Sequence, residues 1–201
     1  MSLLAMVVLV STGCSVETDR EAAVPRSTNA VSVPPSLEST PAVTYRPASA
    51  AGPAENVQLP VMPEEAKVES KQGLIAFARY WYEVASYAYE TGDVEPLKEI
   101  SGPDCTACRG AYSTLEVWYG GNGWAGGGQI NVTSVASEYA LTDEGQRQVL
   151  VMFRQVPINV YSPEGPTRTV GEGDGYVQLM DAVFVEGRWT ALDIVTIKQM
   201  P

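Results

Sequence analysis

A glycine-rich run at residues 120–128 separates two parts of the chain whose apolar residues repeat at different intervals. Before the run, Leu74, Phe77 and Trp81 recur at steps of three and four residues, which is the period of an amphipathic helix. After it, segments rich in Val, Ile, Thr and aromatic residues are separated by turn residues, as in β-strands and hairpins. Helices followed by strands, rather than alternating with them, predict an α+β domain.

Helix caps and turn residues set the expected boundaries. We expect three helices, at residues 63–91, 94–100 and 105–119. Pro63 suits the first helical position, and Asp93 and Asp104 can cap the second and third helices. We expect four antiparallel strands, at residues 129–141, 148–161, 175–186 and 189–198. The predicted domain, residues 63–201, therefore packs three N-terminal helices on one face of a four-stranded sheet.

Residues 15–62 have a different composition from the predicted domain. They hold seven of the 14 prolines and one aromatic residue, Tyr45, whereas all four tryptophans lie beyond residue 63. Such a segment cannot bury enough apolar surface to offset the entropy lost on ordering. We predict a disordered tether, rich in Pro, Ser and Ala, over residues 14–62.

The chain before the tether is short and apolar. Residues 3–10 are all apolar and are followed by Ser11-Thr12-Gly13-Cys14. This run is too short to span a membrane stably, but it fits the apolar part of a secretory signal. The pattern resembles a bacterial lipoprotein signal at residues 1–13. That resemblance implies that Cys14 is acylated, with the protein lipid-anchored at the extracytoplasmic face of the cell membrane.

The other two cysteines form a Cys-x-x-Cys pair, Cys105 and Cys108. They leave Cys14 as the odd cysteine, which lipidation would explain. With no histidine in the chain, two thiolates are too few for a structural zinc site, so we expect no metal. Outside the cytoplasm we expect a disulfide, either a structural clip or a redox pair. The clip is favoured because helices, rather than a strand, precede the pair.

Charge and composition exclude several classes of function. The chain carries 24 acidic and 13 basic residues, a net charge of −11, so it would repel nucleic acid. The absence of histidine excludes catalysis through an imidazole. We expect no cofactor.

Asp181 and Asp193 are the weak candidates for catalysis, because both interrupt apolar strands. A carboxylate inside an apolar cone could act as a general base if a tyrosine converged on it. Tyr82 is the preferred partner, and Tyr80 and Tyr87 are alternatives. The other interpretation is that each carboxylate pairs with a cation, such as Arg154 or Arg79, or points to solvent.

The order of elements is similar to the nuclear transport factor 2-like, or cystatin-like, cone, in which helices precede a curved antiparallel sheet. The segments 62–67, 89–93 and 103–108 resemble an actinobacterial family of predicted lipoproteins of unknown function. The resemblance covers about residues 61–198 and implies the fold and the location, but no chemistry.

Taken together, these features favour a non-catalytic binding domain of the cell envelope. The alternative is a small-molecule isomerase or hydratase that uses a buried aspartate and a tyrosine. The expected partner is an envelope protein or a small apolar ligand, and a homodimer through the sheet is a further expectation. The candidate pocket residues are Phe77, Trp81, Trp118 and Trp124.

Overall fold

The protein is represented by a computed structural model that describes residues 44–171 and 175–200. The predicted signal at residues 1–13 and the predicted lipidation of Cys14 lie outside these residues. The described residues belong to one compact unit, residues 41–201. In none of the helices described is there a stretch long and apolar enough to cross a membrane.

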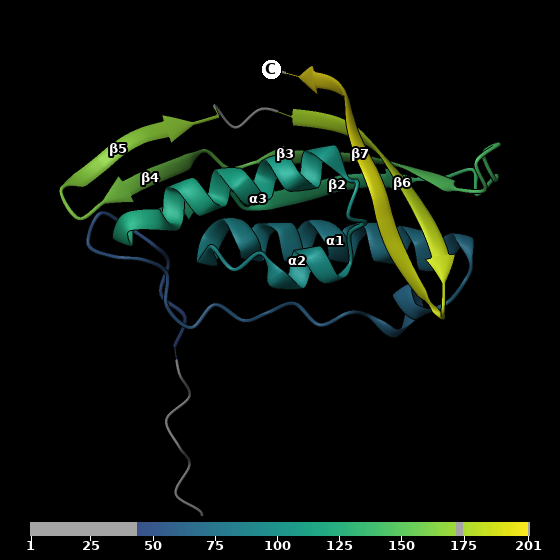
Figure 1. The fold of residues 1–201 in the computed structure, drawn as a ribbon, viewed down its shortest axis with the longest axis horizontal. Helices are drawn as coiled ribbons and strands as arrows, with labels where there is room; N and C mark the ends of the chain where they lie inside the picture. Colours follow the sequence, from purple (N-terminus) through teal and green to yellow (C-terminus); the bar gives the residue numbers. More distant parts are fainter. Residues whose placement is uncertain (1–43, 172–174, 201) are drawn as a thin grey trace, which may run out of the picture. The chain divides into compact units, whose positions relative to one another are not determined.

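The unit is α+β, but strands predominate in it (Figure 1). Its helices are α1 (Lys71–Thr91), the single-turn α2 (Glu95–Glu99) and α3 (Thr106–Tyr119), with short 3₁₀ turns η1 (Glu64–Lys67) and η2 (Gly120–Asn122). Its strands are β1 (Trp124–Gly127), β2 (Ile130–Ala136), β3 (Arg147–Gln155), β4 (Ile158–Ser162), β5 (Gly165–Val170), β6 (Gly175–Val185) and β7 (Arg188–Met200). They form two sheets, in the orders β1-β4-β5 and β2-β3-β6-β7. The expected three helices on one four-stranded sheet were therefore wrong, because only α1 and α3 are full helices and the strands divide between two sheets.

The sheets divide where the backbone cannot continue a ladder. The predicted strand at residues 148–161 is interrupted at Val156 and Pro157, and proline has no N–H to donate. On the neighbouring chain segment, Gly127 and Gly128 have φ angles of +86° and +81°, which suit glycine. Strand β1 thus lies within the glycine-rich run at residues 120–128, and β5 lies between the predicted strands at residues 148–161 and 175–186.

The first long helix starts later than expected. Lys71, rather than Pro63, is the first residue of α1; the N-cap is Ser70, whose hydroxyl accepts a hydrogen bond from the Gly73 N–H at 2.9 Å. The chain after Pro63 forms only η1. Gly92, with a φ angle of +77°, ends α1. The following residues, 95–99, make one turn only.

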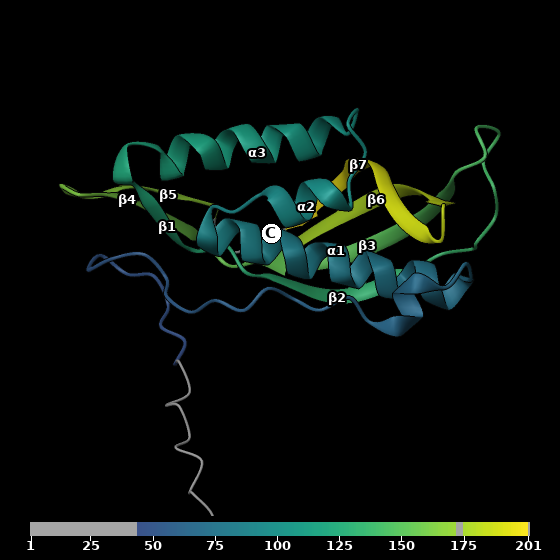
Figure 2. The same ribbon diagram turned by 60° about the horizontal axis from the view of Figure 1, so that its bottom comes forward.

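The core lies between α1 and the inner face of the four-stranded sheet. Leu74, Phe77 and Val84 on α1 are fully buried. Val149, Val151 and Met180, on the sheet strands, are fully buried as well. Figure 2 shows α3 apart from α1, with α2 between them. Helices α1 and α3 both contact the sheet, so this face and the two helices enclose the interior.

Residues 44–62, which we assigned to the tether, pack on the domain as a strap. Backbone hydrogen bonds join Arg46 and Glu55, closing a turn within the strap. The Trp124 indole Nε1 donates to the Ser49 carbonyl at 2.8 Å, and the Tyr45 hydroxyl donates to the carboxylate of buried Glu90. Residues 44–62 therefore pack with the domain, which we expected to begin at residue 63.

We expect the strap to loosen as the pH rises from about 10 to 12. The hydrogen bond to Glu90, then burial, raises the pKa of Tyr45 from 10.0 to about 12. Since the pKa in the folded state is the higher one, this contact stabilises fully below pH 10 and is lost through pH 12. Trp124 fluorescence reports the change. Tyr45→Phe should abolish this step in the titration. It should weaken strap docking by only about 1 kcal/mol, because the ring is half exposed. If Tyr45→Phe gave the same titration curve as the wild type, the assignment of the step to Tyr45 would be wrong.

Candidate functional site

A cavity of about 110 Å³, here called the inner cavity, lies between the helices and the four-stranded sheet. Helices contribute aromatic and aliphatic side chains to its wall, and the sheet contributes two amides and three apolar side chains. The lining residues are Trp81, Tyr82, Ala85, Tyr89, Leu97, Ala107, Ala111, Leu115, Ile130, Phe153, Gln155, Gln178 and Ile194. All of these side chains are uncharged.

The cavity exists because α3 presents short side chains to the sheet. Ala107, Ala111 and Leu115 are four residues apart, so they lie along one face of the helix. Ala111 is half-buried and leaves room that a larger side chain would fill, whereas Ala107 is exposed. Leu115, only 1% exposed, closes the same wall.

The start of α3 is fixed by the disulfide between Cys105 and Cys108, whose Cα atoms lie 5.2 Å apart. Cys105, rather than the expected Asp104, is the N-cap, and its Sγ accepts from the Cys108 N–H at 3.2 Å. Both cysteines are almost completely buried. A buried disulfide is inaccessible to an exchanging thiol, so this geometry favours the clip over the redox pair.

One polar pathway leads out of the inner cavity. The Tyr82 hydroxyl donates to Gln178 Oε1 at 2.7 Å, and Gln178 Nε2 donates to Thr196 Oγ1 at 3.0 Å. Burial raises the pKa of Tyr82, so its hydroxyl remains protonated at physiological pH. Tyr82 therefore acts as a hydrogen-bonding group, and its oxygen can still accept a hydrogen bond from a ligand.

A second polar pair lines another part of the cavity. Burial raises the pKa of Tyr89, so this hydroxyl is also protonated, and the Gln155 amide lines the cavity as well. Gln155 Nε2 donates to the carbonyl of Gly128 at 3.2 Å. The cavity thus combines aromatic and aliphatic walls with tyrosine and amide groups held in place by hydrogen bonds.

The structure does not bring the predicted acids and tyrosines together. Met180 and Ala182 are fully buried against the helices, so Asp181 between them points to the opposite face of the sheet. Asp193 is its direct neighbour on β7 and lies on the same face. Asp181 accepts a hydrogen bond from Gln148 Nε2 at 3.0 Å, and this donor is an amide rather than a cation or a tyrosine.

The alternative tyrosines serve other contacts. Tyr80 is buried in the core, and the Tyr87 hydroxyl lies 3.5 Å from an oxygen of Asp93. An enzyme that pairs Asp181 or Asp193 with Tyr82, Tyr80 or Tyr87 is therefore not favoured by this geometry.

Of the four predicted pocket residues, Trp81 lines the inner cavity. Tyr82, which was expected as a catalytic partner, lines it as well. Phe77 is completely buried in the core. Trp118 borders a separate groove near β4 and β5, and the Trp124 ring stacks on Tyr161 with a centroid separation of 5.7 Å.

The amides Gln155 and Gln178 line the cavity but were not among the residues expected from the sequence. Gln178 alternates with Tyr176 and Met180 on β6, and an amide in such an inward-facing row is a signal of a polar wall. Within the described part of the chain, no three His, Cys, Asp or Glu side chains gather as a metal site would require.

Comparison with known families supplies the classification. Residues 43–194 match the model of a family of unknown function, DUF6318. The chain belongs to this family. The family match includes the strap and ends in β7, so it covers nearly all of the unit that holds the inner cavity. No curated protein sequence matches the chain.

Two solved structures show limited similarity to this DUF6318 chain. The intermembrane space region of the chloroplast protein ARC6 is 11% identical, with a TM-score of 0.42, over 64% of this chain and 97% of the other. Aln2 from a Streptomyces species is 12% identical, with a TM-score of 0.39, over 62% of this chain and 89% of the other. Neither similarity bears on what this chain binds.

Proposed function

We propose that this protein is a membrane-tethered extracytoplasmic lipoprotein whose domain binds a small, largely apolar ligand without transforming it. The observation that carries the proposal is the inner cavity, with its uncharged lining and the fixed Tyr82–Gln178 hydrogen bond. We also propose that the protein is related to actinobacterial lipoproteins and that its domain is similar to the nuclear transport factor 2-like cone.

The cavity chemistry supports binding rather than catalysis. Apolar walls with a few oriented polar groups are the usual composition of a ligand pocket. The protonated Tyr82 hydroxyl and the Gln178 amide can orient a hydroxyl or carbonyl group, but neither is a strong acid or base at neutral pH. A volume of about 110 Å³ suits a single small ring or the end of an apolar chain.

p-Cresol, an apolar ring with one hydroxyl, is a suitable probe for this cavity. We expect it to shift the NMR resonances of Trp81 and Tyr82 and to bind about tenfold more weakly to Ala111→Phe, which fills the cavity. Val117→Phe is the matched control, because Val117 lies on the same helix but is 74% exposed. Toluene tests the polar group, since Tyr82→Phe should weaken p-cresol binding but leave toluene binding unchanged. Equal binding of p-cresol to Ala111→Phe and to the wild type would refute the cavity as the site.

The location is supported by the sequence before the domain. The disulfide uses Cys105 and Cys108, so Cys14 after the apolar run is the remaining cysteine. Cys14→Ala should move most of the protein from the membrane fraction to the soluble fraction and remove the mass of the acyl chains. The double variant Cys105→Ser/Cys108→Ser should stay in the membrane fraction. If Cys14→Ala remained in the membrane fraction and kept the mass of the acyl chains, the lipoprotein proposal would be wrong.

A further inference from the structure

The face of the four-stranded sheet that points away from α1 and α3, here called the outer face, carries a continuous apolar row. Backbone register places Ala136 on β2, Leu150 on β3, Leu179 on β6 and Val195 on β7 directly side by side. Val195 is 48% exposed, and Ile197 farther along β7 is 57% exposed. Apolar side chains that line up across a whole sheet and remain open to solvent are typical of an interaction surface.

Three residues of this row, Ala136, Leu150 and Leu179, line a groove of about 490 Å³, here called the outer groove. Leu150 and Leu179 lie at its base, and the segment that follows β2, residues 137–142, forms its wall. Leu141 in that wall is 62% exposed. The outer groove therefore offers a concave apolar surface, on the opposite side of the sheet from the inner cavity.

A row of polar and acidic groups runs beside the apolar row. Gln148, Asp181 and Asp193 are direct neighbours across β3, β6 and β7, two residues along from Leu150, Leu179 and Val195. The hydrogen bond that Asp181 accepts comes from Gln148, a neutral donor, so the negative charge of Asp181 is not neutralised by it.

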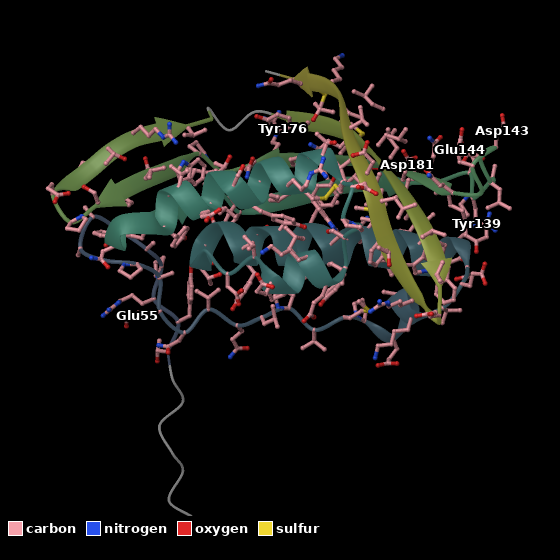
Figure 3. All side chains as sticks on the ribbon, in the orientation of Figure 1. Glu55, Tyr139, Asp143, Glu144, Tyr176 and Asp181 are labelled. Carbon is pink, nitrogen blue, oxygen red and sulfur yellow. A yellow bond between two sulfur atoms is a disulfide. The ribbon has the colours of Figure 1, made fainter. Side chains whose placement is uncertain are left out.

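Further carboxylates lie at this end of the sheet. Glu138 lines the outer groove, and Asp143 and Glu144 lie at the tip of the turn before β3 (Figure 3). Arg147 and Arg188 begin β3 and β7 nearby, and the Arg147 guanidinium lies over the Tyr139 ring, 3.7 Å from its centroid. These three carboxylates, together with those of Asp181 and Asp193, outnumber the two arginines. The rim of the groove is therefore negative.

We propose that the outer face docks a segment of a partner protein that combines apolar side chains with lysine or arginine. The apolar row would take the segment's apolar side chains, and the carboxylates of Asp181, Asp193 and Glu138 would face its cations. An apolar centre with a charged rim is the usual composition of a protein interface, and complementary charge speeds and orients docking. The proposal does not depend on ligand binding in the inner cavity.

Charge also argues against two other occupants. A second copy meeting this face through a two-fold axis would bring the Asp181–Asp193 row toward the same carboxylates of its partner. Anionic lipid headgroups would be repelled by the same row in a chain of net charge −11. The homodimer expected from the sequence thus becomes an outcome that the experiment distinguishes.

A photocrosslinking amino acid at Leu179 tests the proposal in cells that produce the full chain. Val195 provides a second incorporation site, and Val117 on α3, which is 74% exposed, is the control position. We expect adducts to another protein from Leu179 and Val195 but not from Val117, with the crosslinked segment rich in apolar residues and lysine or arginine.

A synthetic peptide of the crosslinked segment then tests the charges. Its affinity for Asp181→Asn/Asp193→Asn should fall about tenfold, and its salt dependence should decrease. Glu83→Gln/Glu116→Gln, the same charge change on exposed helix positions, should leave the affinity unchanged. The proposal would be overturned if the adducts contained only a second copy or only lipid, or if the crosslinked segment were acidic. It would also be overturned by equal labelling from Val117, or by an equal loss of affinity in both charge variants.

Discussion

Gly127→Ala is expected to lower the free energy of unfolding by about 3–4 kcal/mol. The φ angle of +86° alone costs an alanine about 1–2 kcal/mol. In addition, a Cβ atom at this position would overlap with the carbonyl oxygen of Pro157, which is backbone and cannot move aside as a side chain can. The two strands that approach each other at the division between the sheets would have to separate. Urea unfolding followed by circular dichroism measures the change.

Gly145→Ala is the matched control for this prediction. Gly145 also has a positive φ angle, +77°, but no atom lies within 4 Å of the position its Cβ would take. This variant should therefore lose only the cost of the backbone conformation, about 1–2 kcal/mol. Equal losses in the two glycine variants would show that the Gly127–Pro157 approach is absent in solution.

Trp189→Ala is expected to cost about 3–5 kcal/mol, the range found when a large buried aromatic side chain is removed. Trp189 is 2% exposed, its ring packs edge-on against Phe184 at a centroid separation of 5.1 Å, and its Nε1 donates to the Val68 carbonyl at 3.0 Å. It therefore joins the β6–β7 hairpin to the turn before α1. Thermal and urea unfolding measure the loss.

Two further variants separate the contributions at Trp189. Trp189→Phe keeps most of the ring volume and removes the hydrogen bond, so it should cost about 1–2 kcal/mol. Trp124→Ala removes the same side chain from a half-buried position on the strap side and should cost less than half as much as Trp189→Ala. A loss at Trp124 as large as that at Trp189 would show that the core does not centre on the four-stranded sheet.

The α+β class and the positions of α1, α3, β6 and β7 followed from periodicity, because long amphipathic segments carry strong local signals. The division into two sheets did not, although Pro157 inside a predicted strand was a local signal of it. The short strand β1 contains Gly126 and Gly127, and glycine-rich strands show no alternation that could identify them. Such strands are specified by neighbours distant in the sequence.

The direction of Asp181 could not be predicted because both faces of β6 are apolar. Tyr176 and Met180 point to the helices, and Val177 and Leu179 point away from them, so alternation alone did not identify the inner face. The cavity itself depends on Ala107 and Ala111, which look like ordinary helix residues in the sequence. Their effect appears only when α3 is placed against the sheet.

Docking of the strap shortens the distance that the domain could travel from a lipid anchor. If Cys14 is the anchored residue, the tether predicted from the sequence would shorten from residues 14–62 to residues 14–43, about 30 residues, because Tyr45 is already held by Glu90. A chain of that length, if it were a flexible coil, would have a root-mean-square reach of about 30 Å. A membrane protein that presents its docking segment within this distance of the anchor would meet the domain at a raised local concentration, whereas one that presents it much farther out would not.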